Sequence, residues 1–287
     1  MNSMLRFKYI SFIAFLFVLA GCAKNNPLPT WVIISKFSLE DNPTLSEGVL
    51  TENITDGWVY VNDKFIGVFE LPCKLPVLQE GQNLKIAVYP TVRMNGISAT
   101  KVQHPYLDPH VAYLNFVSGD STFVNPVTRY SSGTQFWIED FQSGSIKLTN
   151  GIDNTASLSQ MIDPDDANNK FAKILLTEAQ SHWSMYTSDA LSLAGRRTIL
   201  EFDYCNTANI STTVIAGKAD ATIVDHPHVR ANAQDAATMK WKKIYIDITE
   251  TVNLSQGYLF WQGFKASLTS GRTEDVVMID NIKVVYR

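Results

Sequence analysis

Three side chains of the metal-ligand type lie together in the polar stretch 217–239. Asp225 supplies a carboxylate, and the imidazoles of His226 and His228 follow at a spacing of two residues. Such a set could hold a metal ion such as zinc. The alternative is an exposed loop stiffened by Pro227, which we favour because no further ligand lies nearby in the sequence.

Carboxylates gather in a second segment, where Asp163, Asp165 and Asp166 precede Asn168. Oxygen ligands of this kind suit Ca²⁺. Their spacing does not match the EF-hand loop, and the turn has no glycine. We therefore favour a solvated polar turn.

Aromatic side chains offer a different chemistry, the stacking of sugars. The apolar face of a pyranose packs on an aromatic ring, while polar side chains bind the hydroxyl groups. Six residues are available for this: Trp137, Trp183, Tyr186, Trp241, Tyr258 and Trp261. Because most aromatics of a β-sandwich fill its core or form edge pairs, we expect at most about two to face a ligand. Our candidates are Trp183 and Trp261, and alternation places Trp183 and Tyr186 on opposite faces of one strand.

Catalytic motifs are missing from the sequence. A hydrolase needs a nucleophile beside a base, or two carboxylates across a cleft. The chain has no G-x-S-x-G, HExxH, P-loop or G-x-G-x-x-G pattern. His104 and His110 lie in a proline-containing segment, and His182 is expected at a strand surface or edge. We therefore expect no enzymatic activity, no catalytic residue and no required cofactor.

The composition supports a packed globular chain without a nucleic-acid partner. The 287 residues are 45% hydrophobic and 18% charged, which excludes a largely disordered protein. The net charge of -4 gives no overall positive field toward nucleic acid.

Period-two alternation recurs along the chain and predicts an all-β fold. The first set of strands covers residues 58–61, 65–69, 84–89, 112–116 and 121–124, with a hairpin turn at 62–64 and Pro90 ending a strand. The second set covers residues 136–141, 171–176, 182–186, 198–204, 211–215, 241–248, 257–261 and 276–286. The stretch 130–134 is the most linker-like, so we expect two domains, at 30–130 and 131–287.

The N-terminal leader carries a targeting signal. Arg6 and Lys8 precede an apolar run that ends in Leu19-Ala20-Gly21-Cys22. This ending resembles the lipobox of bacterial lipoproteins, which implies a signal peptide at 1–21 and diacylglycerol on the Cys22 thiol. A plain secretory signal is the alternative. Residues 22–29 are expected to form a short tether.

The lipobox resemblance also bears on location and charge. Ala23 is not the aspartate associated with inner-membrane retention, so the resemblance implies a lipid-anchored outer-membrane protein. Whether it lies on the periplasmic or the surface face is left open. Loss of residues 1–21 removes Arg6 and Lys8 and makes the mature net charge -6.

Two more cysteines, Cys73 and Cys205, fall in different expected domains and in apolar surroundings. We interpret them as separate buried thiols, with an interdomain disulfide as the alternative.

The first domain resembles the PEGA family of small β-domains. The resemblance covers about 50 residues, from the hairpin at 58–72 through 75–81 to the return strand at 84–90. The PEGA tetrapeptide is absent, and Asp63 stands where glycine is usual. The resemblance implies a small β-sandwich that acts as a structural or interaction module.

The second domain resembles the galactose-binding-like, or carbohydrate-binding-module-like, jelly rolls. The strands that carry this resemblance open at Phe136 to Phe141 and close at Ile279 to Val284. It implies a jelly-roll β-sandwich, and domains of this class often hold a structural calcium near the first and last strands. The corresponding residues here are Glu139, Asp140 and Asp280.

Taken together, the sequence predicts a non-catalytic cell-envelope lipoprotein that acts as a binding or assembly module. The main interpretation is that it binds another envelope protein, through an apolar patch or exposed sheet edge near the domain junction. The alternative is glycan binding through the jelly-roll domain, on an aromatic-lined face or cleft.

The lipobox generates the first testable prediction. Replacing Cys22 with Ser removes the thiol that receives the lipid, so we expect the protein to leave the membrane fraction. Membrane fractionation with intact-mass measurement of the mature chain checks this. The interpretation is wrong if the wild-type chain carries no acyl mass on Cys22.

Overall fold

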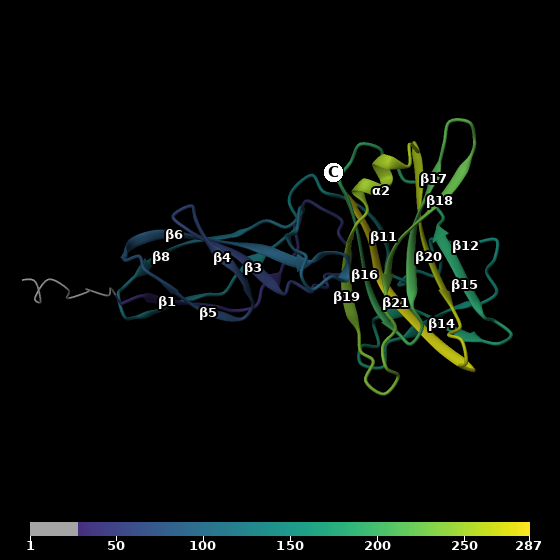
Figure 1. Cartoon of the computed structure of the whole chain (residues 1–287), viewed down its shortest axis with the longest axis horizontal. Helices are drawn as coiled ribbons and strands as arrows, with labels where there is room; N and C mark the ends of the chain where they lie inside the picture. Colours follow the sequence, from purple (N-terminus) through teal and green to yellow (C-terminus); the bar gives the residue numbers. More distant parts are fainter. Residues whose placement is uncertain (1–27) are drawn as a thin grey trace, which may run out of the picture.

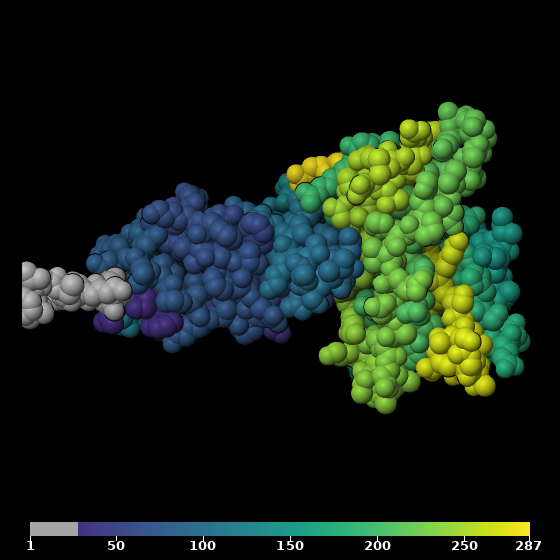
Figure 2. Space-filling model, in the orientation of Figure 1, coloured from purple at the N-terminus to yellow at the C-terminus, as the bar shows by residue number. Residues whose placement is uncertain are grey.

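The computed structural model describes residues 28–287 and shows two β domains arranged end to end (Figures 1 and 2). The expected signal peptide, Cys22 and most of the tether lie outside the described residues. The predicted all-β class, a small β-sandwich followed by a jelly-roll β-sandwich, is confirmed. Within the described part of the chain, no helix is long and apolar enough to span a membrane.

The N-terminal domain is a small sandwich of two main sheets. The larger sheet contains β3 (Asp56–Val61), β4 (Lys64–Glu70), β6 (Gly81–Arg93), β7 (Lys101–Gln103) and β8 (His110–Phe116). In it, β4 pairs with β3, β3 pairs with β6, and β6 also pairs with both β7 and β8. The smaller sheet has the order β5-β1-β9, made of β1 (Thr30–Ile34), β5 (Cys73–Val77) and β9 (Ser121–Val124). A short pair joins β2 (Ser38–Leu39) to β10 (Val127–Thr128), and the 3₁₀ turn η2 (Met94–Gly96) follows β6.

Alternation packs the two sheets of this domain against each other. Val32 and Leu75 of the smaller sheet share one buried cluster with Val59 and Val88 of the larger sheet. The PEGA resemblance itself stays a prediction from the motif.

The predicted hairpin is confirmed as β3-β4. Its two turn residues, Asn62 and Asp63, have φ angles of 47° and 61°. A tight hairpin turn of this type needs two left-handed residues, which asparagine and aspartate tolerate better than other non-glycine residues. Asn62 and Asp63 therefore adopt the conformation that this turn requires.

The expectation that Pro90 ends its strand is wrong, because β6 continues to Arg93. The Pro90 carbonyl accepts a hydrogen bond from the His104 amide at 2.9 Å, so it points toward the β7 side. In an antiparallel strand the nitrogen and the carbonyl of one residue point to the same side, so the Pro90 nitrogen does not face β3. The missing N–H therefore costs no hydrogen bond with β3, and the pairing with β7 ends next to it, at Thr91.

The C-terminal domain consists of two antiparallel sheets. We call the one next to the N-terminal domain the junction sheet; it contains β11 (Gln135–Glu139), β13 (Leu158–Ile162), β14 (Lys170–Thr177), β16 (Thr198–Asn206), β19 (Lys242–Asp247) and β21 (Glu274–Tyr286). The distal sheet contains β12 (Leu148–Asn150), β15 (His182–Thr187), β17 (Ile210–Gly217), β18 (Ile223–Ala231) and β20 (Leu259–Ser267). The short helix α2 (Thr249–Leu254) follows β19.

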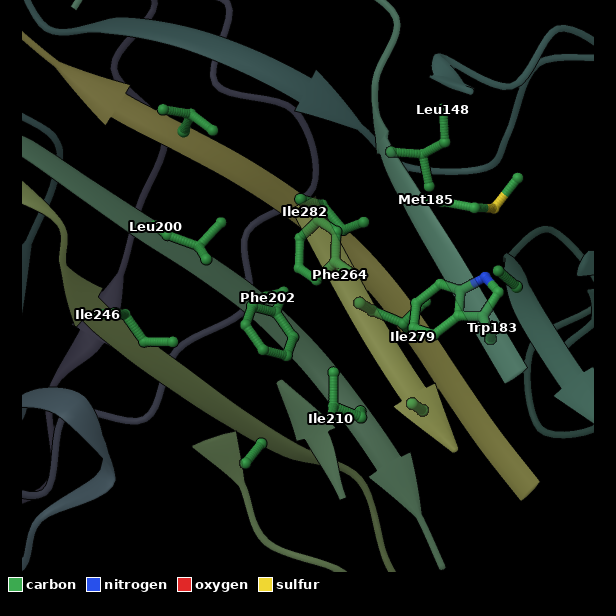
Figure 3. Packing of buried hydrophobic residues seen from close by; sticks show 14 of the residues in the cluster. Leu148, Trp183, Met185, Leu200, Phe202, Ile210, Ile246, Phe264, Ile279 and Ile282 are labelled. Carbon is green, nitrogen blue, oxygen red and sulfur yellow. The ribbon is translucent and has the colours of Figure 1, made fainter. Parts of the chain in front are cut away.

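Large aromatic side chains fill the space between these sheets. Trp183 and Phe264 of the distal sheet meet Phe202 and Ile279 of the junction sheet (Figure 3). The Phe202 and Phe264 rings meet edge to face, with centroids 5.5 Å apart.

Strand β18 corrects the expectation of a loop at 217–239. Its polar sequence hides the strand, but it pairs with β17 from Ile210↔Ala231 to Gly217↔Ile223. As the last strand of the distal sheet, β18 tolerates Pro227 because one side of it makes no ladder hydrogen bonds.

The N-terminal domain packs on the outer face of the junction sheet. Ile199, Tyr245 and Val285 point outward from that sheet and belong to the hydrophobic cluster of the N-terminal domain. The Asn53 amide donates to the Tyr245 hydroxyl at 3.0 Å, and the Asp247 amide donates to the Asn95 side chain at 3.0 Å. The two domains therefore share one continuous apolar and hydrogen-bonded interface.

A buried carboxylate lies at the centre of this interface. Glu201 accepts a hydrogen bond from the Tyr130 hydroxyl at 2.8 Å and lies 3.1 Å from His104 Nε2 and 3.5 Å from Lys243 Nζ. Lys283, also buried, donates to the Val49 carbonyl at 2.7 Å. Each of these four contacts joins residues that are more than 40 positions apart in the sequence.

Charges around Glu201 determine its protonation. Burial acts to raise the pKa of Glu201, but Lys243, His104 and Lys283 outweigh it and lower the pKa to about 2. Burial and the Lys243 charge lower the pKa of Lys283 to about 8. At neutral pH the interface thus holds an ionised carboxylate among basic groups.

Both cysteines are free thiols, as predicted; Cys205 of the jelly roll is buried, whereas Cys73 of the N-terminal domain is only half-buried. Burial raises the pKa of both thiols. Both therefore stay protonated at neutral pH.

The interface generates the second prediction. Replacing Glu201 with Gln leaves two lysines without their carboxylate, so we expect the free energy of unfolding to fall by about 3–5 kcal/mol at pH 7. Urea denaturation measures this change. Replacing the exposed Asp63, which pairs with Lys85, with Asn is the control and is expected to cost less than about 1 kcal/mol.

The same pair of variants has a defined pH dependence. The pKa of Glu201 is lowered on folding, so its stabilisation is complete above its ordinary value of 4.5 and is lost as the pH falls toward 2. The difference between wild type and Glu201→Gln should therefore shrink below pH about 4.5. Equal stability at pH 7 would contradict this account of the interface.

Candidate ligand-binding groove

The outer face of the distal sheet points away from the N-terminal domain (Figure 1). Alternation along four adjacent strands determines which side chains reach this face. The register places Tyr186, Gly263 and Thr213 in one row, and Trp261 and Ile215 in the next. Ser184, Lys265 and Ser211 form a third row.

Glycines keep the floor of this face low. Gly263 lies between Tyr186 and Thr213, and a Cβ atom there would come within 2.5 Å of the Thr213 methyl carbon. A Cβ atom on Gly217 would come within 3.1 Å of the Trp261 ring. Without these side chains, the sheet has a hollow beside Tyr186, and the Trp261 ring lies against the backbone of β17.

Two hollows form one groove across the sheet. The first has a volume of about 560 Å³ and is lined by aromatic and aliphatic side chains, namely Tyr186, Ile215, Ile223 and Trp261. The second has a volume of about 550 Å³ and is lined by polar side chains, namely His182, Asn209, Ser211, Arg230 and Ser267. Thr213, Asp225 and Lys265 line both, so the groove is continuous.

An ion pair lies where the hollows meet. Lys265 Nζ is 2.6 Å from Asp225 Oδ2, and the other oxygen of Asp225 accepts a hydrogen bond from the Thr213 hydroxyl. Both charged side chains are part-exposed. They present donors and acceptors to a ligand while cancelling most of each other's charge.

A histidine with two partners lies at the polar end of the groove. His182 Nδ1 is 2.8 Å from Ser267 Oγ, and Nε2 is 3.0 Å from Asp153 Oδ2. Ser267, His182 and Asp153 are linked in the way that the serine, histidine and aspartate of a hydrolase triad are linked. However, His182 is part-exposed and Asp153 is mostly exposed. Water screens such a group, whereas catalysis depends on a dry, preorganised setting. We interpret the trio as holding the segment 151–156 against β15.

The structure separates the two predicted ligand-contacting tryptophans. Trp261 lines the groove. The prediction for Trp183 is wrong, because its side chain is fully buried and stacks on Phe264 with centroids 6.4 Å apart (Figure 3). The aromatic partner of Trp261 in the groove is Tyr186. Alternation could have identified it, since Tyr186 shares a face with polar His182 and Ser184 while Trp183 shares one with Met185.

The predicted calcium residues accept hydrogen bonds from the protein itself. Both oxygens of Glu139 accept backbone amides, from Phe141 at 2.7 Å and from Lys147. Asp140 accepts the Gln142 amide at 3.1 Å. Across residues 28–287, no three His, Cys, Asp or Glu side chains are placed to hold a metal ion. The Glu139 and Asp140 carboxylates therefore serve backbone hydrogen bonds, and calcium binding stays a prediction from the jelly-roll resemblance.

Asp280, the third of these residues, is a buried acid. It accepts hydrogen bonds from the Asn281 amide at 2.7 Å and from Asn169 Nδ2 at 3.2 Å. Burial, with nearby Asp203 and Asp140, raises the pKa of Asp280 to about 7.

The other two ligand-like segments have structural roles. In the turn at 163–168, Asp163 accepts the Asp165 amide at 2.9 Å and Asp166 accepts the Asn168 amide at 3.0 Å. On β18, His226 and His228 point to the opposite face from Asp225 because their positions differ in parity. His228 instead lies 3.0 Å from the Asp247 carbonyl.

No protein-family profile and no curated protein matches the chain. Solved structures are similar in fold. A carbohydrate-binding module from a study of promiscuous specificity in the β-sandwich superfamily shares 12% identity at a TM-score of 0.40, over 80% of this chain and 84% of that chain. A family 29 module solved with mannohexaose shares 12% identity at a TM-score of 0.36, over 53% and 92% of the two chains.

A third similar structure is the xylan-binding family 22 module of Xyn10C from Paenibacillus barcinonensis. It shares 10% identity at a TM-score of 0.37, over 52% of this chain and 92% of that chain. Identities and TM-scores of this size carry no ligand specificity over to the present chain.

Proposed function

We propose that this protein is a lipid-anchored envelope protein that binds a glycan in the groove of the distal sheet. The observation that carries the proposal is the joining of Tyr186 and Trp261 to hydrogen-bonding side chains in one continuous groove. Aromatic rings pack on the apolar faces of sugars, and the Lys265–Asp225 pair offers a donor and an acceptor to hydroxyl groups.

The shape of the groove favours a segment of a sugar chain over a compact ligand. Its two hollows run side by side across the sheet and are open to solvent rather than enclosed. An aromatic hollow next to a polar one suits consecutive sugar units. Each unit then presents a ring face to one part of the groove and hydroxyl groups to another.

The direction of the groove agrees with lipid anchoring at Cys22. The described chain begins at the free end of the N-terminal domain, and the distal sheet lies at the other end of the long axis (Figure 1). An anchor at residue 22 would therefore leave the groove facing away from the membrane. Glycans of the surrounding medium or envelope could then reach it.

We propose binding without catalysis. Three carboxyl or ammonium groups have strongly shifted pKa values: Glu201 and Lys283, which are buried in the domain interface, and the buried acid Asp280. None of these three groups lines the groove of the distal sheet. The groove histidine, His182, is part-exposed, and its partner Asp153 is mostly exposed.

Glycan binding generates the third prediction. Replacing Trp261 or Tyr186 with Ala removes a stacking surface, so we expect the affinity for any glycan captured on an array to fall about tenfold, or roughly 1.4 kcal/mol. Calorimetric titration with the captured glycan measures the change. Trp241→Ala is the matched control, because Trp241 is exposed, packs on Phe171 of the junction sheet and lies outside the groove.

A blank array with the full mature chain would argue against glycan binding. So would equal affinity loss in all three variants, because that pattern reports damage to the fold rather than lost stacking.

A second candidate function is binding of an envelope protein, favoured by an aromatic face on the larger sheet of the N-terminal domain. The Phe65 ring lies 5.3 Å from both Trp58 and Tyr60, and Tyr60 lies 5.4 Å from Tyr89. Phe65, and Tyr113 on β8 of the same sheet, are more than half exposed. An exposed aromatic face of this kind suits a protein surface.

This candidate generates the fourth prediction. Replacing Phe65 and Tyr113 with Glu places charges on the aromatic face, so we expect loss of any envelope protein that copurifies with the wild-type chain after cross-linking. Trp261→Ala should leave that copurification unchanged. Recovery of the bait alone from wild-type cells would count against the candidate.

A further inference from the structure

The smaller sheet of the N-terminal domain has an apolar outer face. Along β1, Val32 and Ile34 point into the core, so Trp31 and Ile33 point outward. Phe123 of β9 is paired with Ile33 and is 66% exposed. Leu78, which follows β5, is 69% exposed. The face therefore leaves apolar side chains in contact with solvent.

Two more apolar side chains continue this face around the end of the sheet. Leu28 and Val117 are both more than half exposed. The Ser118 hydroxyl donates to the Leu28 carbonyl at 2.8 Å, and the Thr30 hydroxyl donates to the Val117 carbonyl at 2.9 Å. Thr30 also pairs with Val77, next to Leu78. We call the whole surface the anchor-end face, made of Leu28, Trp31, Leu78, Val117 and Phe123.

The chemistry of this face matches a membrane interface. Lys74 Nζ lies 4.8 Å from the centre of the Trp31 ring. Tryptophan is enriched at the level of lipid headgroups, and lysine reaches its ammonium into water or toward phosphates while its methylenes cover apolar surface. Glu80 and Asp120 are the acidic residues next to the face in the chain. They favour a zwitterionic surface over a strongly anionic one.

The position of the face identifies its occupant. The described chain starts at residue 28, two residues before β1, and the N-terminal segment lies at the end of the long axis away from the jelly roll (Figure 1). Cys22 is six residues earlier, which an extended chain spans in at most about 20 Å. A lipid on Cys22 would therefore hold the anchor-end face within reach of the bilayer.

We infer that the anchor-end face rests on the lipid surface and orients the protein on the membrane. The inference relies on the acylation of Cys22 that is part of the proposed function. Contact at this face adds apolar surface to that of the acyl chains and restricts rotation about the tether. The distal sheet lies at the far end of the molecule, so its groove stays free.

Tryptophan quenching by lipids tests the inference. The mature acylated chain is placed in phosphatidylcholine vesicles whose acyl chains carry bromine, which quenches tryptophan emission on contact. We expect quenching that is mostly lost in Trp31→Phe, since Trp31 is the tryptophan on this face. Trp58→Phe is the matched control and should keep the quenching, because Trp58 lies on the larger sheet.

A second variant tests the face without removing the reporter. Replacing Leu78 and Phe123 with Glu places two charges on the face, and quenching of the retained Trp31 should fall. Quenching that is the same in wild type and Trp31→Phe overturns the inference, as does quenching unaffected by the two glutamates.

Coupling the chain chemically to lipid separates this inference from the anchor. The mature chain carrying Cys73→Ser is joined through the Cys22 thiol to a maleimide lipid in the same vesicles. If mass measurement shows no acyl group on the cellular protein, the anchor proposal fails, while the coupled chain still reports on the face. Quenching of Trp31 in the coupled chain supports the inference, and its absence overturns it.

Discussion

The arrangement of the whole molecule depends on one buried carboxylate. Glu201 has no exposed surface, and burying its charge is costly unless partners surround it. Two of those partners, His104 and Tyr130, come from the N-terminal side, and Lys243 comes from the jelly roll. Because no single domain supplies the full set, the charge is satisfied only when the domains are docked in this orientation.

Docking uses one of the two outer faces of the jelly roll and leaves the other free. The junction sheet gives Ile199, Tyr245 and Val285 to the core of the N-terminal domain. The distal sheet keeps its outer face in solvent, and small residues at Gly263 and Gly217 make it hollow. The domain interface thus decides where a ligand can bind, although it lies on the opposite side of the sandwich.

Much of the fold was predictable because alternation is a local property. The strands around Trp58, Ile86, Phe202 and Ile246 show their buried faces within a few residues. Alternation failed where an edge strand needs little hydrophobicity, as in polar β18. Proline rules failed at Pro90 because the missing N–H faces the end of a neighbouring strand.

The sequence by itself determined the all-β class, the hairpin at Asn62 and Asp63, and the opposite facing of Trp183 and Tyr186. Only the tertiary structure decided which face is core and which is solvent, and hence that Tyr186 and Trp261 share the groove while Trp183 fills the interior. It also brought His104 to Glu201, 97 residues away. Strand periodicity tells which side chains share a face, but the covering of that face depends on contacts between segments far apart in the chain.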